Sequence, residues 1–235
     1  MNSPPASRTF RPLHALLAAG CVLVSGHAPA AGPAPAEQKP LPVALVDSLD
    51  ALSGGPPAGY RADHAKGVLV SGTFTPAPTG ASLSKAPHFR QKVPVVVRFS
   101  DTTGVPNMPD ASPDARPHGM AIRFQIPGGL STDIVGLSAN GFPVATAEDF
   151  VALLTAVAQR DGESTTDGTQ VWPDDRRLVE LGTIALTAVS KDQVEDQKAL
   201  LFNPIDLPTG IAPSDDPVLA ARFPAYAVSV RQRLD

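Results

Sequence analysis

The sequence predicts an α+β fold in which consecutive short strands form an antiparallel sheet flanked by helices. Two short runs carry the strand signal most clearly: residues 93–99 (VPVVVRF) are rich in β-branched side chains, and residues 120–126 (MAIRFQI) alternate with period two. The 26 prolines and 19 glycines among 235 residues limit how long a helix can run. Hydrophobic residues make up 43% of the chain, which is enough for a packed core.

The expected elements follow one another in chain order. A helix is expected over 43–52, because its apolar residues have helical spacing and a Gly-Gly-Pro-Pro run ends it. The helix expected over 147–158 begins after Thr146, an N-cap with Asp149 three residues later. The last segment, from Leu219, is helix-like, but Pro224 is expected to interrupt it and to tilt the residues beyond. Strands are expected over 68–74, 93–99, 120–126, 132–135 and 181–189.

Residues 1–30 have the composition of an export signal. Arg8 and Arg11 precede an apolar stretch over 13–24, and a small-x-small pattern predicts cleavage after Ala30. The apolar stretch is shorter than the ~20 residues that span a bilayer. Lipoprotein processing at Cys21 is the weaker alternative. The mature chain is therefore expected in the periplasm or outside the cell.

Composition also limits the classes of partner. Residues 31–42 are a Pro/Ala-rich tether, and 43–235 are expected to form one domain. The formal net charge is -4 and no block of basic residues occurs, which argues against nucleic acid and against an anionic membrane as partners. Cys21 is the one cysteine, so neither an intrachain disulfide nor a cysteine-based metal cluster is expected.

Polar residues that could carry chemistry stand at strand ends, in a turn and on one helix face. Taken singly, each has an ordinary structural explanation, such as a strand end, a turn or a solvent-facing stripe. The segment 136–140 lacks the second glycine of a nucleophile elbow, which argues against a serine hydrolase. The histidines after the signal have no metal-site spacing, which argues against a zinc enzyme. The polar residues, in chain order, are Arg61, His64, Arg98, Ser100, Asn140, Arg222, Tyr226 and Arg233.

The order of these clusters resembles the haem catalase superfamily, and in particular its small exported branch, the catalase-related peroxidases. The first two matching motifs are Arg61-Ala-Asp-His64-Ala-Lys-Gly67 and Val95-Val-Val-Arg98-Phe-Ser100. The third is Gly119-Met-Ala-Ile-Arg-Phe124. The rest are Asp133-Ile-Val-Gly136 with Asn140-Gly-Phe-Pro143, and Arg222-Phe-Pro-Ala-Tyr226 with Arg233. Each motif is modest alone, whereas five in the same order make the resemblance specific.

The resemblance implies a haem b cofactor with its iron, a peroxide substrate and a small-molecule electron donor. His64 would be the distal acid–base residue, oriented by Ser100, and Asn140 would donate a hydrogen bond to the peroxide. Tyr226 would ligate the iron, since tyrosine is the haem-iron ligand in catalases. The other residues that would contact the cofactor are Arg222 beside the phenolate, Arg61, Arg98 and Arg233 at the propionates, and Phe150 as a packing aromatic.

The resemblance also implies that part of the family's fold is missing. The matching stretches leave no room, near residues 151–157, for the second half of the family's antiparallel β-barrel. We therefore expect an incomplete catalase-like barrel with flanking helices. A half-barrel leaves a strand edge that favours pairing with another chain, so a homo-oligomer is left open. The alternative function is that of a non-catalytic haem or ligand binder, or of a degenerate relative.

Overall fold

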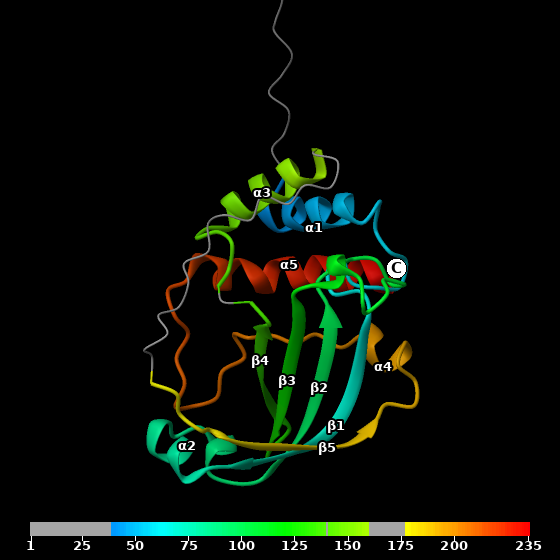
Figure 1. The fold of residues 1–235 in the computed structure, drawn as a ribbon. Helices are drawn as coiled ribbons and strands as arrows, with labels where there is room; N and C mark the ends of the chain where they lie inside the picture. The colour runs from blue at the N-terminus through cyan, green and yellow to red at the C-terminus, as the bar shows by residue number, and fades with distance from the viewer. Residues whose placement is uncertain (1–38, 140, 160–176) are drawn as a thin grey trace, which may run out of the picture. The chain divides into compact units, whose positions relative to one another are not determined.

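A five-stranded antiparallel sheet forms the centre of the fold (Figure 1). In the computed structural model of the chain, residues 39–139, 141–159 and 177–235 are described. The strand order is β4-β3-β2-β1-β5, so the last strand returns to pair with the first. The strands are β1 (Gly67–Pro76), β2 (Val93–Asp101), β3 (His118–Ile126), β4 (Leu130–Leu137) and β5 (Gly182–Val189).

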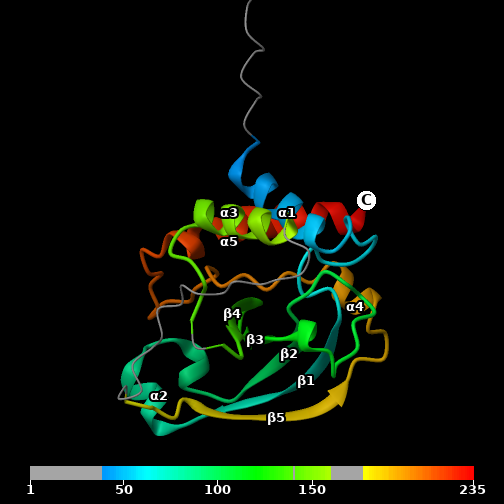
Figure 2. The same cartoon turned by 45° about the horizontal axis from the view of Figure 1, so that its top comes forward.

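Three helices pack together beyond one end of the sheet: α1 (Leu41–Leu52), α3 (Ala147–Gln159) and α5 (Pro217–Leu234) (Figures 1 and 2). Helix α1 contacts both α3 and α5. No helix among the described residues combines the length and the apolar character needed to cross a bilayer. The short elements are the helices α2 (Pro78–Leu83) and α4 (Glu195–Lys198) and the 3₁₀ turns η1 (Pro87–Phe89) and η2 (Pro113–Ala115).

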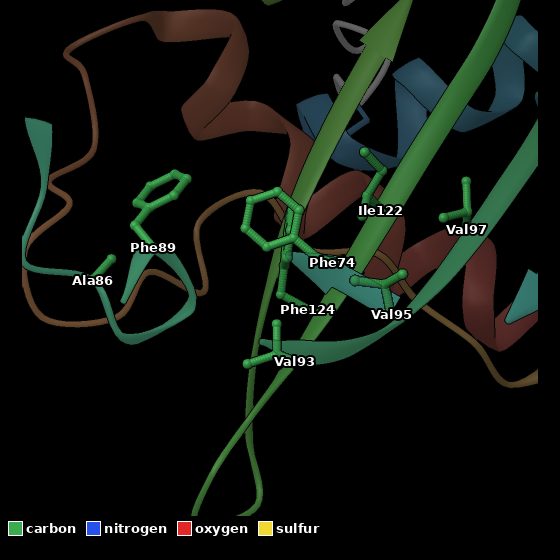
Figure 3. Packing of buried hydrophobic residues seen from close by; sticks show 8 residues of the cluster. All are labelled: Phe74, Ala86, Phe89, Val93, Val95, Val97, Ile122 and Phe124. Atoms are coloured by element: carbon green, nitrogen blue, oxygen red, sulfur yellow. The ribbon is translucent and has the colours of Figure 1, made fainter. Parts of the chain in front are cut away.

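The hydrophobic core lies on one face of the sheet, because alternate residues of each strand point to the same side. Val93, Val95 and Val97 on β2 are each about 1% exposed, and their side chains pack with Ile122 and Phe124 of β3. Phe74 meets Phe124 edge to face, with ring centroids 5.1 Å apart. The turn η1 and the residue before it add Phe89 and Ala86, which cover the end of the cluster (Figure 3).

Most of the predicted elements are confirmed within a few residues. The predicted cap is also confirmed, since the Asp149 N–H donates to Thr146 Oγ1 at 3.1 Å. The sequence missed the short elements α2, α4, η1 and η2, which have no extended apolar periodicity. It also predicted a sheet of consecutive strands only, whereas β5 pairs with β1 over residues 70–76.

The prediction that Pro224 interrupts the last helix is wrong. Helix α5 runs unbroken from Pro217 to Leu234 with Pro224 inside it. Proline removes one backbone N–H, which leaves the carbonyl four residues earlier, that of Ala220, without its helical donor. Ala220 and Pro224 are both exposed, so water can satisfy that carbonyl.

The sheet is open, as expected for an incomplete barrel. Among the described residues, no strand pairs with the outer edge of β4 or of β5. The expected export signal, most of the tether, Asn140 and residues 160–176 lie outside the described residues.

Candidate functional site

His64 lies in the loop before β1, and its ring faces the end of β2. Its Nδ1 is 2.9 Å from Ser100 Oγ. The backbone of His64 has φ of 56°, in the left-handed region, where its N–H donates to Asp63 Oδ1 at 2.9 Å. Gly119 on β3 pairs with Ser100, and a Cβ there would lie 2.7 Å from both His64 Cε1 and Ser100 Oγ. Glycine at position 119 therefore leaves the space that the His64–Ser100 pair occupies.

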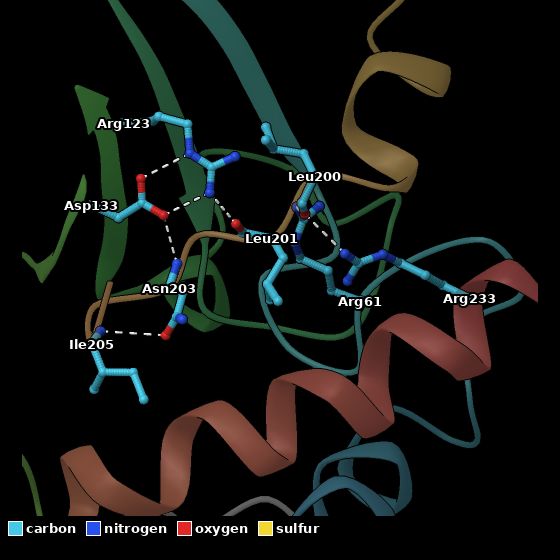
Figure 4. A network of polar contacts seen from close by, with 8 residues as sticks. All are labelled: Arg61, Arg123, Asp133, Leu200, Leu201, Asn203, Ile205 and Arg233. Carbon is cyan, nitrogen blue, oxygen red and sulfur yellow. Dashed lines mark hydrogen bonds and ion pairs between the residues drawn. The ribbon is translucent and has the colours of Figure 1, made fainter. Parts of the chain in front are cut away.

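Three arginines from distant parts of the chain surround this loop. Arg61 and Arg233 both donate to the carbonyl of Leu200, at 2.6 and 2.9 Å (Figure 4). Arg98, from β2, donates to the carbonyl of His64 at 2.7 Å. Arg98 and Arg233 are each 4% exposed. We call Arg61, Arg98 and Arg233 the arginine cluster.

The cluster concentrates positive charge, which among the described residues only the more distant carboxylates of Asp63 and Asp101 partly offset at Arg98. Among the described residues, none of the three guanidinium groups forms an ion pair. Burial, together with repulsion from Arg98 and Arg233, lowers the pKa of Arg61 to about 8. Burial lowers the pKa of Arg98 to about 10, with Arg233 adding to the effect, and burial alone lowers that of Arg233 to about 10. A bound carboxylate would relieve this repulsion, so the cluster is suited to an anion.

Helix α5 brings a phenol to the same region. Arg222 Nη1 donates to Tyr226 Oη at 3.3 Å, one helical turn along. Tyr226 is close enough to Arg61 that the phenolate form of its side chain would oppose the lowering of the arginine pKa. Ser229, on the next turn, accepts a hydrogen bond from the Ala62 N–H at 3.4 Å. The helix that bears Tyr226 is therefore tied to the loop that bears Arg61 and His64.

Aromatic residues extend the site beyond Arg222. The guanidinium carbon of Arg222 lies 5.7 Å from the centre of the Phe142 ring, within cation–π distance. Phe142 in turn meets Phe150 of α3 edge to face, with centroids 4.9 Å apart. Phe150 is thus linked to Tyr226 through Phe142 and Arg222.

Residues 190–206, which we call the crossing segment, hold the arginine cluster against the sheet. The side-chain amide of Gln193 donates to the Leu69 carbonyl at 3.0 Å and accepts from the Leu69 N–H at 2.7 Å. Gln197 Oε1 accepts from Arg98 Nε at 2.5 Å. Further along, the carbonyls of Lys198 and Leu200 accept from Arg233. Sequence reasoning missed this segment, because backbone carbonyls carry no residue-type signal.

An ion pair between the partly buried Arg123 and the buried Asp133 fixes the far end of the crossing segment. Arg123 and Asp133, cross-strand partners on β3 and β4, form a bidentate pair at 2.9 and 2.7 Å. Asp133 also accepts from the Asn203 N–H at 2.6 Å, and Arg123 donates to the Leu201 carbonyl (Figure 4). The hydrogen bond to Asp133 is the largest cause that raises the pKa of Arg123.

A cavity of about 190 Å³ opens between the Arg61 loop and the crossing segment, with Arg61, Lys66 and Lys198 in its lining. Neither His64 nor Tyr226 lines it. The described residues contain no cluster of three or more His, Cys, Asp or Glu side chains arranged to hold a metal ion. A haem iron that is held by a single tyrosine does not require such a cluster.

Of the site residues predicted from sequence, the structure pairs His64 with Ser100, pairs Arg222 with Tyr226, and gathers Arg61, Arg98 and Arg233. Phe150 contacts Phe142, whose ring lies within cation–π distance of Arg222. Asn140 lies outside the described residues. The functional roles of these residues stay predictions.

An open antiparallel sheet therefore carries a site of histidine, arginine and tyrosine side chains. The catalase family profile matches residues 59–165 and 158–235, so the chain belongs to the catalase family.

Relatives within this family are named catalase-related peroxidases. One from Mycolicibacterium paratuberculosis is 41% identical over 113 residues, which cover 47% of this chain and 36% of that protein. One from Synechococcus elongatus is 23% identical over 297 aligned positions, which cover 79% of this chain and 87% of that protein. That alignment is longer than this chain, so the relative carries residues that have no counterpart here.

Other comparisons cover smaller parts. A catalase from Pseudomonas syringae pv. syringae is 38% identical over 93 residues, covering 39% of this chain and 17% of that protein. The chain therefore matches about a third of the length of the Mycolicibacterium relative and 17% of the length of the Pseudomonas catalase. Solved structures of a bacterial and a fungal catalase share 28% and 22% identity, each with a TM-score of 0.38 over 46% of this chain and 21% of the other.

Proposed function

We propose that the chain is a haem-dependent peroxidase of the catalase type, which reduces hydrogen peroxide or organic hydroperoxides with electrons from a small-molecule donor in antioxidant defence. The observation that carries the proposal is the arginine cluster. It presents three cations without ion-paired carboxylates among the described residues, beside the His64–Ser100 and Arg222–Tyr226 pairs; Arg98 and Arg233 are buried and Arg61 is partly buried.

The residues present fit haem b. Its two propionates are carboxylates, and the guanidinium groups of the arginine cluster are planar forks suited to hold them. Tyr226 would hold the iron through its phenolate oxygen, which the donated hydrogen bond and positive charge of Arg222 stabilise. When bound, the haem would supply the redox chemistry that peroxide reduction requires.

His64 would transfer a proton from one peroxide oxygen to the other. When Nδ1–H donates to Ser100 Oγ, the opposite nitrogen, Nε2, keeps a lone pair that can accept a proton from the first peroxide oxygen. Asp63 Oδ2 lies 3.6 Å from Nε2, close enough to stabilise the imidazolium that forms. Delivery of that proton to the second oxygen would let water, rather than hydroxide, leave.

Haem content and turnover together test the proposal. The purified chain, expressed with haem available, should show a Soret band near one haem per chain and should oxidise a dye only with peroxide present. His64→Gln should keep the Soret band and lose at least about 100-fold of the peroxide-dependent rate, the usual contribution of a positioned acid–base group. Tyr226→Phe should change the Soret band, and an unchanged spectrum would remove Tyr226 as the ligand.

A second candidate is a haem or apolar-ligand binder without turnover. The open sheet favours it, because β5 is largely exposed and a half-barrel excludes water less completely than a closed one. This protein would show the haem spectrum without peroxide-dependent oxidation, and His64→Gln would leave the dye assay unchanged.

We also propose that the chain is exported to the periplasm or secreted, on the basis of the signal-like residues 1–30. Cell fractionation followed by mass spectrometry of the mature N-terminus tests this directly. A mature chain that begins at Ala31 is expected, whereas an unprocessed chain in the cytoplasm would contradict the proposal. A lipid-modified Cys21 would show the lipoprotein alternative.

A further inference from the structure

Within the described part of the chain, strand β5 is an edge strand with almost no protection against pairing. It pairs with β1 on one side, and no described strand pairs with its other side. Its sequence, GTIALTAV, has no charge and no proline, which are the residues that usually block an edge. Leu186 is 45% exposed and Val189 is 62% exposed, although both are apolar.

The exposure of Leu186 has a local cause. Its partner in β1 is Gly72, which has no side chain to cover it. Ile184, two positions earlier on the same face, pairs with Phe74 and packs against the hydrophobic core. The apolar face of the sheet therefore continues onto β5 and stops at Leu186 without a neighbour on the outer side.

The strand is complementary to itself when read in the opposite direction. Antiparallel pairing of two copies about a two-fold axis at Ala185 places Thr183 opposite Thr187 and Ile184 opposite Leu186 of the second copy. Each Leu186 then gains the neighbour that Gly72 does not supply. The irregularity in the β1–β5 ladder lies at Thr187, so the Ile184–Leu186 pairs next to the axis lie in the regular part of the strand and Thr187 lies at its end.

Each end of the uncharged strand carries one charge of each sign. Arg177 and Glu180 precede it, and Lys191 and Asp192 follow it. No block of like charge at either end therefore opposes antiparallel pairing of two copies of the strand.

We infer that β5 is a dimer interface at which two copies of this chain pair β5 to β5, antiparallel and centred on Ala185, into one continuous ten-stranded sheet (β5 at the outer edge in Figure 1). The inference does not depend on the proposed function, since it needs neither haem nor turnover.

Sedimentation equilibrium of the purified full chain provides the first test. The chain is expected to form a concentration-dependent dimer, and Leu186→Lys is expected to weaken it by at least about 30-fold, because two half-buried leucines are lost per dimer. The matched control is Leu130→Lys on β4, the opposite edge strand, where the leucine is 65% exposed. It should leave the dimer intact. A monomeric wild-type chain, open-ended assemblies, or equal loss in the Leu130→Lys variant would overturn the inference.

Disulfide trapping tests the register without depending on how Leu186→Lys folds. In a Cys21→Ser background, Ala185→Cys faces its own copy at the two-fold axis and should form a disulfide-linked dimer on mild oxidation. Ala188→Cys would lie ~20 Å from its own copy in that register, beyond disulfide reach. Equal cross-linking of both variants, or of neither, would overturn the proposed pairing.

Discussion

His88 makes the stability of this fold depend on pH. Its ring is 1% exposed and stacks on Phe124, with centroids 4.7 Å apart and planes 29° apart. No described residue offers a hydrogen bond to its buried Nδ1. Burial lowers the pKa of His88 below 6.5, because a charged ring in this aromatic surrounding would lose its hydration.

The sign of the effect is set by proton binding in the two states. Because the pKa of His88 is lower in the folded chain, the unfolded chain takes up a proton at a higher pH than the folded chain does, so stability falls as the pH falls below about 6.5. If the folded ring is still neutral at pH 5.5, lowering the pH from 7.5 to 5.5 costs about 1.4 kcal/mol of unfolding free energy through this one group. His88→Leu removes that contribution.

Urea unfolding at pH 7.5 and 5.5 measures the difference. The stability lost between the two pH values should be smaller in His88→Leu than in the wild type, by at most about 1.4 kcal/mol. Because the comparison is made within each protein, any packing defect from the substitution cancels. Equal pH dependence in His88→Leu and the wild type would refute this reasoning.

Three further predictions concern the site and the core. Gly119→Ala should leave secondary structure by circular dichroism unchanged but lower peroxide-dependent dye oxidation at least about tenfold, since its Cβ would displace the His64–Ser100 pair; wild-type turnover would contradict this. Arg123→Met should lower the unfolding free energy in urea by about 3–5 kcal/mol, because it leaves Asp133 charged and buried; a loss below about 1 kcal/mol would show that the pair is dispensable. Phe124→Ala should cost about 3–5 kcal/mol in the same assay, whereas Phe99→Ala, at an exposed position on the same face of the sheet, should cost less than about 1 kcal/mol; equal costs would place the core elsewhere.

The strands were predictable because each carries its signal locally. β2 and β3 alternate between the buried core face and the opposite face, and residues near each other in sequence set that alternation. The pairing of β5 with β1 was not predictable in this way, since more than a hundred residues separate Gly72 from Leu186 and no local pattern encodes the contact. The effect of Pro224 was also not predictable from local sequence. A helix tolerates proline where the carbonyl four residues earlier, here that of Ala220, can bind water instead.

The sequence predicted which residues form the candidate site, but it did not predict the groups that position them. The order of motifs picked out Arg61, Arg98 and Arg233, and the structure brings the three together. They are positioned by the carbonyls of Lys198 and Leu200 and the amide of Gln197. A carbonyl belongs to every residue, so no sequence pattern distinguishes the ones that bind a guanidinium.

The crossing segment links the open sheet to the site. Strand β5 ends where Val189 pairs with Val70, so the start of β1 needs other partners. The Ser190 N–H and the Gln193 side chain bind the backbone of Leu69, and Gln197 donates to the Gly67 carbonyl at 3.1 Å. Gln197 also accepts from Arg98, so the group that completes the edge of β1 positions the arginine cluster as well. A substitution that loosens the crossing segment should therefore weaken the sheet and displace the cluster together, because both depend on the same hydrogen bonds.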